Sequence, residues 1–218
     1  QPRRDVRADD GLAGVRGPVV DQHERERHRL ARDYLGGGDV EANDRWHQIG
    51  DVPGDRIWAT KRELRAQLVD EVRRRLRESW LKRGASEAEL GWTDSVLDPD
   101  VLTIGFARRV PTYKRLTLML RDPERLKALL TDPERPIQLV IAGKSHPADE
   151  TGKQLIQQMV RFADDPEVRH RIVFLPNYDI GMAKDLYPGC DVWLNNPLRP
   201  FEACGTSGMK AALNGGLN

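Results

Sequence analysis

From Leu97 onward, short apolar runs alternate with longer stretches of helical pattern. The apolar runs are VLTIGFA (101–107), IQLVIAG (137–143), RIVFLP (171–176) and DVWLNN (191–196). The helical stretches are 113–131, 149–164 and 179–187. Pro123 is expected to divide the first of these into two helices, because proline breaks the helical hydrogen-bond pattern. Strands alternating with helices are typical of βαβ units, which build a parallel sheet with flanking helices.

The sequence therefore predicts an α/β fold with a partial Rossmann-like domain over 98–218. At 218 residues the chain is long enough for one sizeable core and too short for two full α/β domains. In a sheet of this kind, ligands collect at the carboxyl ends of the strands. The residues that directly follow each strand are thus the first candidates for a functional site.

A long amphipathic helix is predicted ahead of this domain, from 58 to about 82. Apolar residues recur at every fourth position, with charged residues on the other faces, at Leu64, Leu68, Val72 and Leu76. This helix makes up most of a helical connection over 41–97. Residues 1–40 are densely charged and show no sustained helical or strand period, so we expect them to be disordered or poorly packed.

Composition excludes several classes of partner. The 35 Lys and Arg residues nearly balance the 34 Asp and Glu residues, so no overall field favours nucleic acid or an anionic membrane. No apolar stretch approaches the roughly 20 residues of a membrane span, and no secretory signal pattern occurs. The two cysteines, Cys190 and Cys204, need no disulfide to explain them. We expect a cytoplasmic chain without a metal site.

A basic cluster follows the first predicted strand. Arg108 and Arg109 stand at the strand end, and Lys114 comes shortly after. Arginine offers a planar fork to two oxygens and lysine a point charge, so the three suit a phosphate dianion. The alternative from the residues alone is a solvated basic loop.

A second group of polar residues follows the fourth predicted strand. The loop delivers the carboxylate of Glu202, and the turn 205–207 then opens a helix whose free backbone amides could receive phosphate or sugar oxygens. Lys210 lies about one turn inside, followed by small and apolar residues. A low-dielectric setting there would depress the pKa of the amine and favour its reaction with a carbonyl. An ordinary exposed helix lysine is the alternative.

Two separated motifs resemble those of the α-glucan (glycogen and maltodextrin) phosphorylase family, bacterial type. RRVPTYKR (108–115) is similar to the phosphate-site motif of that family, and EACGTSGMK (202–210) is similar to its cofactor motif. The segments IAGKSHP and LPNYDIGMA also look like family stretches, so the resemblance covers about 43–218. It implies that 98–218 is part of the C-terminal domain of a GT-B glycosyltransferase fold.

The resemblance also implies a cofactor, pyridoxal 5′-phosphate, attached to Lys210. The amides of Gly205 and Thr206 would lie near the cofactor phosphate and the glucosyl hydroxyls. Arg108 would stand in the place of a family basic residue at the cofactor, and Tyr178 would line the cofactor pocket.

The implied reaction is phosphorolysis of an α-1,4-glucan to α-glucose 1-phosphate, with glycogen or maltodextrin and inorganic phosphate as partners. Arg109 and Lys114 would bind the substrate and cofactor phosphates, and Glu202 would hydrogen-bond the sugar. Cys204 would contact the sugar where the family usually has serine. The cofactor's phosphate, rather than its ring, would relay a proton to inorganic phosphate.

The family's chains are several times longer than this one and imply a homodimer when full length. We therefore expect the 218-residue chain alone to be inactive, and marginally stable because its sheet would lose a covering face. Residues 1–40 match no part of the family, and a frameshifted gene segment is one hypothesis for them. The competing functions are a retaining nucleotide-sugar glycosyltransferase of the glycogen-synthase type and a non-catalytic carbohydrate- or cofactor-binding remnant.

Overall fold

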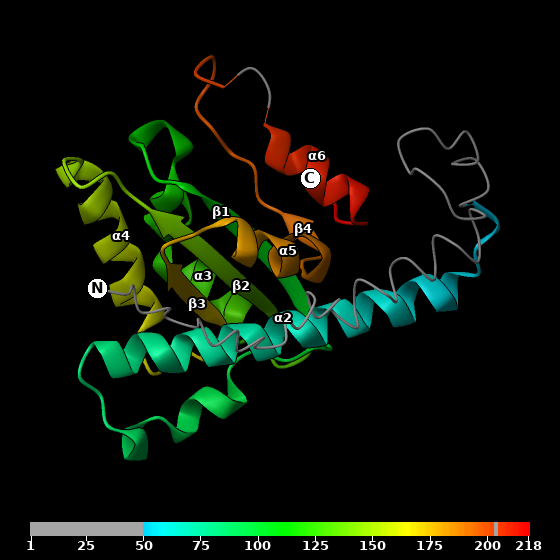
Figure 1. Cartoon of the computed structure of the whole chain (residues 1–218), viewed down its shortest axis with the longest axis horizontal. Helices are drawn as coiled ribbons and strands as arrows, with labels where there is room; N and C mark the ends of the chain where they lie inside the picture. The colour runs from blue at the N-terminus through cyan, green and yellow to red at the C-terminus, as the bar shows by residue number, and fades with distance from the viewer. Residues whose placement is uncertain (1–49, 203–204) are drawn as a thin grey trace, which may run out of the picture. The chain divides into compact units, whose positions relative to one another are not determined.

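The computed structural model describes residues 50–202 and 205–218, and the part from Pro53 onward forms one compact unit. The expectations for 1–40 and for Cys204 lie outside the described residues. Four parallel strands form one sheet in the order β3-β2-β1-β4 (Figure 1). Their bounds are Leu102–Arg109 for β1, Ile137–Lys144 for β2, Ile172–Pro176 for β3 and Val192–Trp193 for β4. The predicted α/β architecture with a parallel sheet is confirmed.

The helices lie where the sequence places them, with one exception. Their bounds are Gly54–Lys82 for α2, Pro123–Leu130 for α3, Glu150–Ala163 for α4, Ile180–Gly189 for α5 and Thr206–Leu213 for α6. The stretch 113–131 is not a helix divided in two. Its first part consists of two 3-10 turns, which Arg115 separates by adopting a left-handed backbone conformation with φ 53°.

Aspartate side chains begin three of these helices. Asp122 accepts a hydrogen bond from the amide of Arg125 at the start of α3, and Asp149 and Asp179 do the same for α4 and α5. Each carboxylate satisfies an amide that the first helical turn leaves without a partner. Proline at the first position of α3 needs no such partner, because it has no N–H.

Helices cover both faces of the sheet. Along β2, Leu139 and Ile141 belong to a core cluster with residues of α3 and α4, whereas Val140 and Ala142 belong to a cluster with residues of α2 and α5. This alternation follows from the two-residue period of a strand. The expectation that the sheet lacks a covering face is therefore wrong for the described residues. None of their helices is long and apolar enough to cross a membrane.

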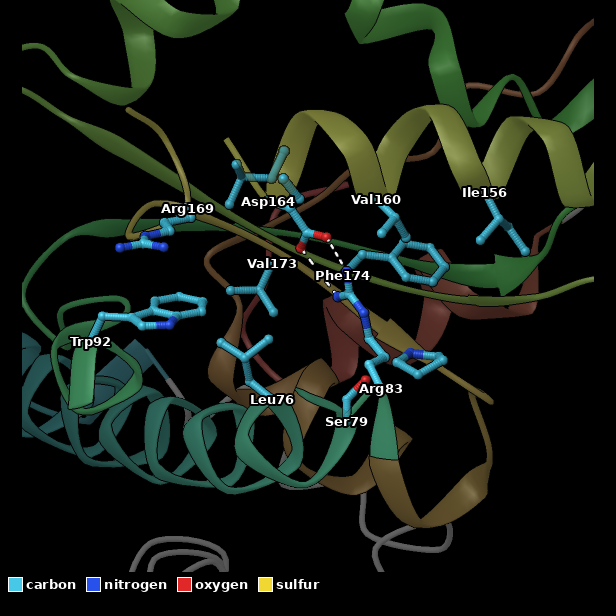
Figure 2. Close-up of a pocket in the computed structure, with 13 residues that line it drawn as sticks. Leu76, Ser79, Arg83, Trp92, Ile156, Val160, Asp164, Arg169, Val173 and Phe174 are labelled. Atoms are coloured by element: carbon cyan, nitrogen blue, oxygen red, sulfur yellow. Dashed lines mark hydrogen bonds and ion pairs between the residues drawn. The ribbon is translucent and has the colours of Figure 1, made fainter. Parts of the chain in front are cut away.

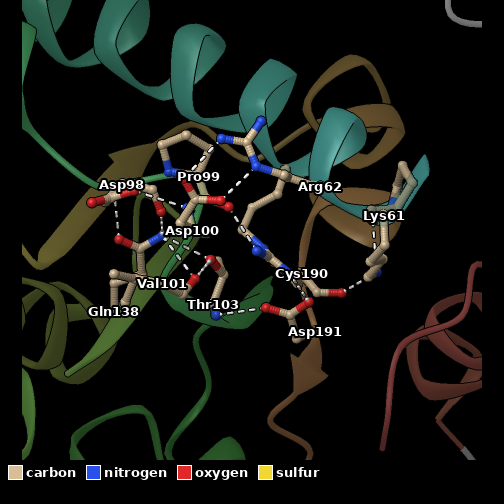
Figure 3. Close-up of polar contacts among 12 residues, drawn as sticks. Lys61, Arg62, Asp98, Pro99, Asp100, Val101, Thr103, Gln138, Cys190 and Asp191 are labelled. Atoms are coloured by element: carbon tan, nitrogen blue, oxygen red, sulfur yellow. Dashed lines mark hydrogen bonds and ion pairs between the residues drawn. The ribbon is translucent and has the colours of Figure 1, made fainter. Parts of the chain in front are cut away.

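Buried polar contacts join α2 to the amino-terminal end of β4 (Figure 3). Arg65 donates to the Asp191 carboxylate at 2.6 Å, and the other oxygen of Asp191 accepts from the amide of Thr103 at 2.8 Å. The Lys61 ammonium donates to the backbone oxygens of Pro188 and Cys190 at 2.7 and 2.5 Å. These contacts join α2 to the start of β4, which is the last strand in the sequence.

β4 is shorter than the predicted 191–196 strand. Leu194 still donates its amide to Gly105 of β1 at 2.8 Å, but the two asparagines that follow turn to other partners. Pro197 then has no N–H to offer to a sheet. The early end of β4 leaves a loop at the carboxyl edge of the sheet, beside the end of β1.

Candidate phosphate- and cofactor-binding site

The carboxyl ends of β1 and β4 lie side by side at the point where the strand order reverses. The chain runs outward from β1 to β2 and β3 and then returns to place β4 on the other side of β1. Ligands of doubly wound folds bind at such a switch point. The two segments that the sequence analysis selected, 108–115 and 195–210, both start there.

Arg108 is the most deeply buried charged residue of this region, with 7% of its surface exposed. Its guanidinium lies over the ring of Phe106, 5.2 Å from the ring centroid, and Nη2 donates to Oδ1 of Asn195 at 2.5 Å. Burial lowers the pKa of Arg108, and the negative charge of Glu202 partly opposes that shift. The side chain is thus a fixed cation in a largely dry setting.

Glu202 joins the two basic residues after β1. Its Oε2 lies 2.5 Å from Nζ of Lys114 and 3.5 Å from Nη1 of Arg108. The loop after β4 therefore places a carboxylate between two cations that come from β1 and its following turn. The side chain of Lys114 also lies over the ring of Tyr113, 4.9 Å from the centroid.

Two donors of Arg108, Nε and Nη1, are buried without a hydrogen bond within the described part of the chain. The 3.5 Å approach of Nη1 to Glu202 is an ion pair without hydrogen-bond geometry. Buried polar groups in native proteins usually find partners. A phosphoryl group would supply oxygens to one of these donors together with Nη2, because each edge of the guanidinium fork matches two phosphate oxygens.

Gly205 brings the start of α6 close to this cluster. A Cβ atom on Gly205 would lie 3.2 Å from Nδ2 of Asn195 and 3.5 Å from Oε1 of Glu202, tighter than or at the limit of ordinary contact. The next residue, Thr206, is the first of α6, and no side chain caps that helix. Open amides at a helix start favour an anion. The arrangement fits a phosphate group bound between β1 and α6.

Lys210 lies on α6 with its side chain exposed, and its Nζ forms no hydrogen bond or ion pair to the residues described. The sequence left open a low-dielectric setting and an ordinary exposed one for this lysine, and the described residues show the exposed one, because no other described element covers that face of α6. The amine is accessible to a carbonyl compound.

Arg109 and Tyr178 differ in their surroundings. Arg109 ends β1 exposed, without an ion pair among residues 50–202 and 205–218. The Tyr178 hydroxyl lies 3.2 Å from that of Tyr187, and burial is the main cause that raises the pKa of Tyr178. The positive charge of Arg108 acts in the opposite direction on that pKa.

Asn195 is the residue of this site to which the sequence analysis gave no role. It contacts Arg108 directly and faces Gly205. Its position at the carboxyl end of the predicted 191–196 strand was the available signal, although an asparagine there is also common in simple turns. No group of three or more His, Cys, Asp or Glu side chains that could hold a metal occurs in the described residues.

A cavity of about 310 Å³ lies elsewhere, between α2, α4 and β3 (Figure 2). Its lining is mainly apolar and includes Leu76, Trp92 and Phe174. Arg83 at its rim is engaged by Asp164 at 2.5 Å. None of the residues predicted from the sequence to bind phosphate or cofactor lines this cavity. The candidate site is therefore the cluster at the carboxyl ends of β1 and β4.

Residues 62–218 match the family model described as Carbohydrate phosphorylase. Over 190 residues the chain is 65% identical to a glycogen phosphorylase of Mycobacterium tuberculosis, covering 87% of this chain and 22% of that protein. It is 47% identical over 193 residues to a glycogen phosphorylase of Aquifex aeolicus, covering 87% of this chain and 28% of the relative. A maltodextrin phosphorylase of Thermococcus litoralis is 40% identical over 190 residues, with 87% and 22% covered. The chain thus spans between a fifth and a third of the length of these relatives.

Proposed function

Because the chain belongs to the carbohydrate phosphorylase family, we propose that it forms the part of the active site of an α-glucan phosphorylase that binds phosphate and the cofactor. The observation that carries this proposal is the buried Arg108, whose Nε and Nη1 have no hydrogen-bond partner in the described structure, beside Lys114 and the Gly205 turn. The sheet then represents part of the C-terminal domain of a GT-B fold. The substrates are an α-1,4-glucan and inorganic phosphate, and the product is α-glucose 1-phosphate.

The residues present fit pyridoxal 5′-phosphate as the cofactor. Its phosphate would lie between Arg108 and the amides of Gly205 and Thr206, Lys210 would provide the covalent attachment, and Tyr178 would line the pocket. When bound, the cofactor supplies a phosphate that exchanges a proton with inorganic phosphate. The exposed amine of Lys210 and the uncapped start of α6 support this assignment.

The cations of the cluster would permit two phosphates to approach each other. Two unit charges about 4 Å apart repel by roughly 1 kcal/mol in water and by about 4 kcal/mol at an effective dielectric constant near 20. Lys114 and the exposed Arg109 would hold the inorganic phosphate. That phosphate would protonate the departing glycosidic oxygen and then attack the sugar with retention of configuration. Glu202, and Cys204 two positions later in the sequence, would position the glucosyl hydroxyls.

The proposal is tested in a chimera in which 62–218 replaces the matching segment of the mycobacterial relative. We expect glycogen- and phosphate-dependent formation of α-glucose 1-phosphate, and a borohydride-reduced cofactor adduct on the peptide that contains Lys210. The variant K210R should lose the adduct and the activity, whereas K184R, at an exposed lysine of α5, should keep both.

An adduct elsewhere, or sugar transfer from a nucleotide sugar instead of phosphorolysis, would contradict the proposal. The second result would favour the glycogen-synthase type of transferase. For the 218-residue chain alone we expect no turnover. Glucose 1-phosphate formation by that chain would show that it forms a working active site by itself. The cytoplasmic location and the homodimer stay predictions.

A further inference from the structure

Asn195 lies between the two halves of the proposed phosphate site. Its Oδ1 accepts a hydrogen bond from Nη2 of Arg108 at 2.5 Å, and its Nδ2 is the nearest atom to the position that a Cβ on Gly205 would occupy, at 3.2 Å. We propose that Asn195 is a positioning residue that holds the Arg108 guanidinium in the orientation that binds a phosphoryl group. This inference rests on the proposed function.

The first support is that Asn195 provides the one hydrogen bond of the Arg108 guanidinium within the described residues. Nε and Nη1 are buried and have none, and the central carbon of the guanidinium lies 5.2 Å from the centroid of the Phe106 ring. The hydrogen bond to Asn195 fixes the direction of one N–H of Nη2 and, because the guanidinium is rigid and planar, the directions of the other donors with it. The second N–H of Nη2 pairs with Nε on one edge of the group or with Nη1 on the other, so one such edge faces a fixed direction, as bidentate recognition of a phosphate requires.

The second support is chemical: the acceptor is a neutral amide. A carboxylate at the same place would orient the guanidinium equally well, but it would cancel the charge that attracts phosphate. Glu202 already contributes one negative charge 3.5 Å from Nη1. An asparagine fixes the geometry and leaves the cation available to an anion.

The third support is the contact with Gly205. Asn195 belongs to the loop after β4, Arg108 to β1, and Gly205 to the start of α6. One side chain therefore sets the spacing between the arginine and the helix amides that would share the phosphate. The amide of Asn195 can act in this way because glycine leaves room for it.

The test uses the chimera and the variants N195A, N195D, R108A and the double variant N195A/R108A. Inorganic phosphate is the probe of the Arg108 pocket in the chimera freed of pyridoxal 5′-phosphate, and its dissociation constant is measured by phosphorus NMR titration. In phosphorolysis, the concentration of pyridoxal 5′-phosphate that restores half of the activity is measured together with kcat. Q154A removes an exposed amide on α4 and serves as the control. Thermal unfolding of each variant shows whether the fold is kept.

We expect N195A to weaken phosphate binding about tenfold, the size of one hydrogen bond to a charged group, and Q154A to leave it unchanged. In the R108A background, N195A should have almost no further effect, because the residue acts through Arg108. N195D keeps the shape and the acceptor, so it should unfold at the same temperature or higher, yet bind phosphate at least as weakly as N195A. The concentration of pyridoxal 5′-phosphate needed for half-maximal activity should rise more than kcat falls.

Three results would overturn the inference: unchanged phosphate affinity in N195A, additive losses in the double variant, or wild-type affinity in N195D. The NMR titration decides the matter even in a chimera without turnover, because binding of phosphate does not require the reaction. An inactive chimera whose N195A and R108A losses are non-additive would contradict the proposed function and support the role of Asn195. An active chimera with additive losses would support the proposed function and contradict the role of Asn195.

Discussion

At the scale of single residues, Glu202 is a counterion to Lys114 and Arg108 within the site. Its carboxylate lies 2.5 Å from Lys114 and 3.5 Å from Arg108, the same cations that the proposed reaction assigns to phosphate. The carboxylate therefore competes with phosphate for these cations. It must in turn rearrange toward the sugar for the proposed hydrogen bond to form.

The substitution E202Q should strengthen phosphate binding by about tenfold, because it removes a negative charge beside two cations in a partly dry site. Phosphorolysis should nevertheless fall, since the sugar loses a charged hydrogen-bond partner. Phosphate affinity and turnover are both measured in the chimera, with E150Q on the exposed start of α4 as control. Weaker phosphate binding in E202Q would show that Glu202 organises the cations rather than opposing phosphate.

Residue patterns predicted much of this site and missed one part of it. Arg108, Lys114 and Glu202 converge as expected, because they follow strands whose carboxyl ends meet at one edge of the sheet. The role of Asn195 was missed because it depends on a side-chain rotamer and a partner 87 positions away. The exposed setting of Lys210 was one of two alternatives that the sequence left open, because small apolar neighbours in sequence do not show what covers a helix face.

At the scale of elements, one buried ion pair joins α2 to the residue that precedes β4. Arg65 and Asp191 are 4% and 11% exposed in their side chains, and the pair also secures the amide of Thr103 in β1. A second pair between the same helix and the 98–101 turn, Arg62 with Asp100, is 54% and 61% exposed. The two pairs allow a matched comparison of burial.

The substitution D191A should lower the free energy of unfolding by about 3 to 5 kcal/mol, because it leaves Arg65 buried without its counterion. D100A should lower it much less, since an exposed pair is screened by water. Both values come from urea denaturation of the 218-residue chain at one pH. Equal effects of the two variants would show that the position of α2 does not depend on the buried pair.

The elements themselves were predicted to different degrees. Three strands and helices α2, α4 and α5 follow the sequence closely because hydrophobic periodicity and aspartate caps mark them. The stretch 113–131 was misjudged because Arg115 adopts a left-handed backbone conformation and donates its side-chain Nε to the backbone oxygen of Asn196, a long-range contact that no local pattern reveals.

At the scale of the whole molecule, the two core clusters on the faces of the sheet indicate a cooperative unit. Cys190 belongs to the cluster that includes α2, α5 and β4, and it is completely buried. Burial raises the pKa of its thiol to about 12. Since the thiolate is the reactive form, Cys190 should react only when the fold opens.

We therefore expect iodoacetamide at pH 8 to leave Cys190 unmodified in the native chain and to label it completely in concentrated urea. Peptide mapping identifies the modified residue. The rate of native labelling should follow the rate of unfolding, so D191A should accelerate it and D100A should not. Rapid labelling of Cys190 in a chain with native circular dichroism would mean that this half of the core opens locally.

The return of the chain from β3 to a place beside β1 has a consequence for biosynthesis. A ribosome releases β1, β2 and β3 first, and these can pair while β4 is still in the exit tunnel. The anion site arises only when β4 joins β1 and carries Asn195 and Glu202 to the waiting Arg108. Phosphate in the cell would therefore bind only chains that have completed their topology, and by mass action it would favour them over three-stranded intermediates.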